Sequence, residues 1–204
     1  MKYILTAIAF CTMFSCYGQL EKGRTFITGI GGYTAFHYDN DQADNETWNG
    51  EVLGGHMITD QFAVGAVATA YSYWSVSRNP STKQRADRQK TETYSVSLVA
   101  RKFFSANNKL HFYLDARPHY QYSSDQYEAQ GEFNSPVITN RLGVSLAPGV
   151  MYFLTDKIAV TAGLGNLSFD RDKQKESNVY QYRFNANFNL SYLSFGASIF
   201  FKMP

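Results

Sequence analysis

The chain has 204 residues, enough for one domain, and its 19 Lys and Arg nearly balance its 17 Asp and Glu. This balance argues against a nucleic-acid binder, which would carry a clear basic excess. Aromatic residues make up 16% of the chain although mean hydropathy is −0.33, a combination typical of membrane β-barrels, which place aromatic girdles at both membrane interfaces.

The first residues have the pattern of a secretory signal peptide. Lys2 is followed by an apolar run at residues 4–14, too short for a transmembrane helix, and then by a small-residue cleavage site. We therefore predict a signal peptide at residues 1–18 and a mature domain at residues 19–204. An alternative interpretation has Cys16 lipidated within a lipoprotein box. Both cysteines fall in the leader, so the mature chain should fold without disulfides.

Segments that alternate between apolar and polar residues follow, as expected for β-strands with two different faces. The eight segments span residues 24–38, 47–58, 61–77, 91–104, 110–124, 140–154, 157–169 and 179–201. Short turns and longer polar loops alternate between them, which is typical of an up-and-down outer-membrane barrel. The sequence therefore predicts an all-β fold: an eight-stranded antiparallel up-and-down transmembrane β-barrel with four extracellular loops.

The two faces of the strands decide which side is the interior. Small or charged residues on one face suit the inside of a narrow barrel that its own side chains fill. A soluble sandwich would bury the apolar faces instead, and few of its strands would be this long. We therefore predict aromatic faces outside and polar faces inside. A soluble periplasmic barrel with reversed faces and an apolar ligand is the alternative.

Three features depart from this pattern. Pro118 and Pro148 fall inside predicted strands, where the missing N–H interrupts the ladder of hydrogen bonds. The apolar parity of the last strand changes at Tyr192 and Leu193, which predicts a β-bulge. The first two strands are rich in glycine and alternate poorly, so their faces are left open.

The signal peptide, the turn and strand FLTDKIAVTAGLG and the closing strand SFGASIFFK resemble small Gram-negative outer-membrane β-barrel proteins. These are similar to the eight-stranded barrel domain of outer-membrane protein A. The resemblance covers the mature chain. It implies a monomer integral to the outer membrane, in contact with lipid and lipopolysaccharide and inserted by the barrel-assembly machinery. The family includes tethers, adhesion proteins, small channels and lipid-modifying enzymes, so the fold alone does not choose a function.

Charged side chains gather on the predicted inner face. They are Glu51, Arg101, Asp115, Arg117, Arg141 and Arg183, accompanied by His111 and His119. One interpretation is a plugged lumen in which these charges pair, because an unpaired buried charge is costly. The other is a narrow porin-like ion path, or a site for a small polar ligand, with an arginine bias that favours anions.

The loop after the third predicted strand is basic. Its cations are Arg78, Lys83, Arg85, Arg88 and Lys90. Arg and Lys suit phosphate groups, so this loop is a candidate for contact with lipopolysaccharide, with ordinary surface charge as the alternative.

Catalytic and cofactor motifs are not apparent. His119 and Ser123 share a strand face but would stand about 13 Å apart, beyond the reach that activation of a nucleophile requires. No metal-ligand spacing or nucleotide motif occurs. We expect no catalytic residue, no metal and no cofactor, and a non-enzymatic structural or surface-interaction role exercised through the extracellular loops. A lipid-modifying barrel enzyme is the remaining alternative.

Overall fold

The computed structural model describes most of the predicted mature domain. The described residues are 20–37, 43–78, 85–129, 132–175, 180–188 and 194–202. The predicted signal peptide, Cys16 and the parity change at Tyr192 and Leu193 lie outside them. No helix among the described residues is long and apolar enough to cross a membrane.

The described part of the chain folds into one antiparallel sheet. Its strands are β1 (Arg24–His37), β2 (Ala43–Thr59), β3 (Phe62–Arg78), β4 (Arg85–Ser105), β5 (Leu110–Ala129), β6 (Glu132–Phe133), β7 (Val137–Phe153), β8 (Ile158–Gly163), β9 (Asn166–Gln174), β10 (Tyr180–Asn187) and β11 (Ser194–Lys202). Eight of them form a hydrogen-bonded ring, β1-β2-β3-β4-β5-β7-β8-β11, in which β11 returns to β1. The predicted eight-stranded antiparallel barrel is confirmed.

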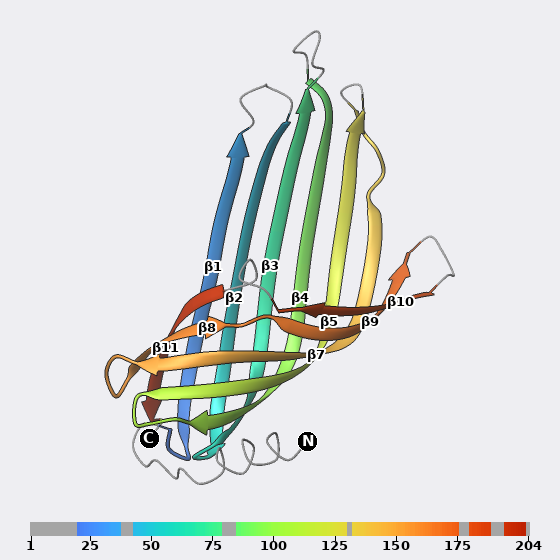
Figure 1. Cartoon of the computed structure of the whole chain (residues 1–204). Helices are drawn as coiled ribbons and strands as arrows, with labels where there is room; N and C mark the ends of the chain where they lie inside the picture. Colours follow the sequence, from blue (N-terminus) through green and yellow to red (C-terminus); the bar gives the residue numbers. More distant parts are fainter. Residues whose placement is uncertain are drawn as a thin grey trace, which may run out of the picture.

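Short turns lie at one end of the barrel, where β1 also begins and β11 ends (Figure 1). They join β2 to β3, β4 to β5, and β7 to β8. At the other end β3, β4 and β5 extend furthest, and β4 alone has 21 residues (Figure 1). We call these the turn end and the loop end. Several strands continue further toward the loop end than the sequence predicted.

The prediction of one continuous strand at residues 157–169 was wrong. Leu146 of β7 pairs with Leu167 of β9, whereas Gly149 of β7 pairs with Gly163 of β8. Two residues of β7 therefore face three on the neighbouring strand, which is the geometry of a β-bulge. The bulge separates β8 from β9 and moves the inward side chains from odd to even positions.

The bulge lies opposite Pro148. Proline has no N–H to donate to the ladder, and here its carbonyl accepts a hydrogen bond from the Leu164 N–H at 2.9 Å. Gly165, within the bulge, has a φ of 120°, which residues with side chains rarely adopt. Pro118 needs no bulge, because β4 and β5 keep one register and the ladder is only interrupted beside it.

The barrel is apolar outside, as predicted. Val96 and Leu98 of β4 are 60% and 67% exposed, whereas Val99 and Arg101 on the same strand face inward and are buried. The alternative with reversed faces is therefore wrong. The structure also settles the faces of β1 and β2. Their inward residues at the turn end include Phe26 and Leu53, both buried.

An aromatic core fills the turn end of the lumen. Phe26 of β1 stacks on Phe200 of β11 with ring centroids 5.0 Å apart, and Phe153 of β7 lies 5.0 Å from Phe200. Phe103 of β4 meets Phe26 edge-on, at a centroid distance of 6.5 Å. The prediction of a polar inner face therefore holds only for the part of the lumen between the aromatic core and the loop end.

Candidate functional site

A layer of buried ion pairs lies directly on the aromatic core. Arg101 donates two hydrogen bonds to the Asp115 carboxylate, at 2.6 and 2.8 Å, and these side chains are only 2% and 0% exposed. The Arg101 guanidinium lies 4.0 Å from the centre of the Tyr113 ring. Arg117 donates to Asp115 at 2.7 Å and to both oxygens of Glu51 at 3.1 Å. Strands β2, β4 and β5 are thereby connected across the lumen.

A second group of ion pairs lies closer to the loop end. Arg141 of β7 donates to both oxygens of Asp172 on β9, at 2.6 and 3.0 Å, and Arg183 of β10 lies 3.0 Å from the same carboxylate. Asp170, two residues before Asp172, accepts from the Ser168 hydroxyl at 2.8 Å. His119 of β5 lies 3.0 Å from the other oxygen of Asp170.

The structure places all six predicted lumen charges on the inner face, but sequence reasoning missed three acids there, Asp125, Asp170 and Asp172. Asp170 and Asp172 were assigned to a loop because the strand was ended at residue 169. From Ser168 to Lys173, small polar or acidic residues alternate with Phe169, Arg171 and Lys173. This alternation was a signal that β9 continues past residue 169. With these three acids included, the four arginines face five carboxylates, so the predicted arginine bias disappears in the described lumen.

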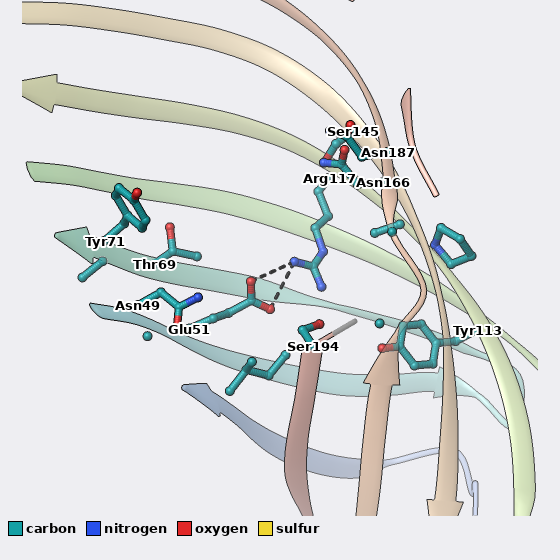
Figure 2. Close-up of a pocket in the computed structure, with 17 residues that line it drawn as sticks. Asn49, Glu51, Thr69, Tyr71, Tyr113, Arg117, Ser145, Asn166, Asn187 and Ser194 are labelled. Carbon is teal, nitrogen blue, oxygen red and sulfur yellow. Dashed lines mark hydrogen bonds and ion pairs between the residues drawn. The ribbon is translucent and has the colours of Figure 1, made fainter. Parts of the chain in front are cut away.

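Above the first ion-pair layer the lumen opens into a cavity of about 510 Å³ (Figure 2). Glu51 and Arg117 lie on its wall, together with polar side chains from five other strands and from β2 and β5 themselves. Figure 2 labels Asn49, Thr69, Tyr71, Tyr113, Ser145, Asn166, Asn187 and Ser194 among them. Small residues such as Ala147 and Gly163 leave the space open.

The two inward histidines lie in different surroundings. His111 is buried beside Phe153, and its Nδ1 lies 2.8 Å from the Ser105 hydroxyl on the adjacent strand. No carboxylate orients this pair among the described residues. Within the described part of the chain, the polar contacts of His119 are with Asp170 and the Arg117 carbonyl, and neither is a hydroxyl or thiol nucleophile. The described residues also contain no group of three His, Cys, Asp or Glu side chains with the geometry of a metal site.

Cations with aromatic partners lie on the outer face toward the loop end. Arg88 and Lys90 of β4 lie 5.6 and 5.0 Å from the Trp74 ring, and each also has an acidic neighbour. Arg171 and Lys173 of β9 lie 4.0 and 5.5 Å from the Tyr180 ring. Of the other predicted loop cations, Lys83 and the side chains of Arg78 and Arg85 lie outside the described residues.

Several solved structures of small bacterial barrels are similar to this chain. Neisserial surface protein A shares 15% identity at a TM-score of 0.49, with coverage of 89% of this chain and 98% of that chain. The N-terminal barrel of OprF from Pseudomonas aeruginosa shares 12% identity at a TM-score of 0.45, with coverage of 88% and 98%. The attachment invasion locus protein Ail of Yersinia pestis shares 10% identity at a TM-score of 0.42, with coverage of 88% and 99%.

The sequence has no match among curated proteins. A family match nevertheless extends over almost the whole chain, from residue 4 to residue 193. It agrees with the closed antiparallel ring, the apolar outer face and the charged interior. The chain belongs to the outer membrane protein beta-barrel domain family.

Proposed function

We propose that this protein is a non-enzymatic outer-membrane barrel with a closed lumen, which acts as a structural or surface-interaction protein through its extracellular loops. The observation that carries the proposal is the continuous filling of the turn end. The aromatic core and the Arg101–Asp115–Arg117–Glu51 layer occupy the lumen one above the other. Each buried charge has an opposite charge within hydrogen-bond distance, which makes separation of the layer costly.

A conductance measurement tests the closed lumen. In planar lipid bilayers the protein is expected to give no discrete conductance steps, because the buried rings of the aromatic core pack against one another across the turn end of the lumen. Replacement of Phe103 and Phe200 by alanine removes two inward rings and should raise the conductance. The matched control replaces Phe104 and Phe201, which follow them on the same strands and face outward.

Folding is checked for each variant by the different migration of unheated and boiled samples in SDS electrophoresis. Steady single-channel steps from the folded wild-type protein would contradict the closed lumen and favour the narrow porin-like channel. Equal conductance of the inward and outward double variants would show that the aromatic core is not the barrier.

Lipopolysaccharide is the second part of the proposal, as a partner of the outer rim. Arg171 and Lys173 point outward at the loop end, and the contacts they make within the described part of the chain are with Tyr180. Arg88 and Lys90 are less available, because Glu128 lies 3.6 Å from Arg88 and Glu92 lies 2.7 Å from Lys90. Cations without a carboxylate partner are better able to bind a phosphate group.

Replacement of both Arg171 and Lys173 by alanine is therefore expected to weaken lipopolysaccharide binding several-fold in phospholipid nanodiscs. The matched control, alanine at Arg88 and Lys90, removes the same two charge types from the same outer face and should have a smaller effect. Binding is measured by fluorescence titration at low and high salt, because phosphate contacts weaken with salt. Equal binding by all three proteins would refute the assignment of the phosphate contact to β9.

A further inference from the structure

The lumen cavity has a wall of polar side chains that lack hydrogen-bond partners among the described residues. Five side chains form no hydrogen bond with other described residues: Asn49, Ser145, Asn166, Asn187 and Ser194. Their amide and hydroxyl groups come from four strands and the end of β10, and all border the same space (Figure 2). Water satisfies such groups when the cavity is empty, and a ligand rich in hydroxyl groups can replace that water.

The charged part of the wall is electrically balanced. Glu51 and Arg117 lie side by side at 3.1 Å, each of the two is less than one-fifth exposed, and Asp115 holds the other side of the guanidinium. A charged ligand would have to compete with these pairs, at the cost of leaving a charge without a partner. A neutral polar ligand can accept or donate hydrogen bonds at their edges without separating them.

The size and position of the cavity further limit the class of ligand that can bind there. At about 510 Å³ it lies within the range of small-molecule sites. The pair Asn49 and Tyr71 lies two residues along the strands from the pair Glu51 and Thr69, in the direction of the loop end. The cavity therefore extends toward the loop end of the barrel. An apolar ligand is disfavoured, because it would leave the wall amides and hydroxyls without hydrogen bonds.

We propose that the cavity binds a neutral sugar of one or two rings that enters from the loop end. The hydroxyl groups of the sugar bond to the amides of Asn49, Asn166 and Asn187 and to the Ser145 and Ser194 hydroxyls. The ring of Tyr71 borders the same space and offers an apolar surface to one face of the sugar. Binding at this site does not require an open turn end, because the cavity lies between the ion-pair layer and the loop end.

The test is isothermal titration of glucose and maltose into the full-length protein in phosphatidylcholine nanodiscs without lipopolysaccharide. Wild-type protein should bind at least one of these sugars, and bind glucose 6-phosphate and glucosamine more weakly. Ala147→Leu places a larger side chain in the cavity and should weaken binding at least tenfold. Ala68→Leu is the matched control, because Ala68 is exposed on the outer face of β3.

A second variant avoids dependence on one substitution. Asn166→Ala with Asn187→Ala removes two wall amides without adding volume, and should also weaken binding of the neutral sugar at least tenfold. Absence of binding of both neutral sugars to the wild-type protein would overturn the proposal. So would tighter binding of the charged sugars, or unchanged affinity in both the Ala147 variant and the double asparagine variant.

Discussion

Replacement of Asp115 by alanine is expected to lower the free energy of unfolding by about 3–5 kcal/mol, the cost typical of breaking a buried ion pair from one side. Asp115 is fully buried and accepts hydrogen bonds from both Arg101 and Arg117. Its removal leaves the Arg101 guanidinium without any carboxylate within the described lumen. Arg117 keeps Glu51 and loses its second partner.

The measurement is unfolding of the detergent-solubilised barrel by urea, followed through the shift between the folded and unfolded bands in unheated SDS electrophoresis. Asp172→Ala is the control at the loop end. It also removes a carboxylate between two arginines, but Arg183 is 48% exposed and can be hydrated. Its effect should be smaller. Equal losses in the two variants would mean that burial does not determine the strength of these pairs.

An arginine in place of Leu98 is expected to destabilise the membrane-inserted barrel by about 2–4 kcal/mol, the cost of a cation on the lipid face near the bilayer midplane. Leu98 lies within the outward run Tyr94, Val96 and Leu98 of β4 and is 67% exposed. In a soluble protein an exposed position of this kind would tolerate arginine. The same substitution therefore tests the orientation of the faces as well as the stability.

Ser124→Arg provides the comparison. Ser124 faces outward on β5 closer to the loop end, and its strand partner is Glu92, which favours a cation. The expected change there is about 0–1 kcal/mol, since the cost falls toward the membrane interface. Unfolding in lipid vesicles measures both variants. A tolerated arginine at position 98 would contradict a lipid-facing β4.

The sequence predicted the strands in which the type of each residue depends only on whether its side chain faces the lipid or the lumen. On β4, β5 and β7 strict alternation was sufficient, because lipid outside and a narrow lumen inside select opposite side chains. The division of residues 157–169 into β8 and β9 was not predicted. Pro148 was recognised as a problem, but its consequence appears on a different strand, which sequence spacing does not reveal.

The ion pairs also could be predicted only in part from the sequence. The inward position of Arg101, Asp115 and Arg117 follows from alternation within one or two strands. Which charge meets which depends on the register between strands distant in sequence, such as Glu51 with Arg117 across 66 residues. The aromatic core was missed for a related reason. Phe103 has the same parity as Arg101, and only its height in the barrel distinguishes the two surroundings.

The pairing of β1 with β11 also has a kinetic consequence. Phe26 and Phe200 complete the aromatic core only when the first and last strands of the ring meet, and the hydrogen bond between Thr28 and Ser198 joins residues 170 positions apart. Contacts of such high sequence separation carry a large loop-closure entropy and form late in folding. Until that step the sheet has two free edges and an incomplete interior, and the final pairing removes both defects at once.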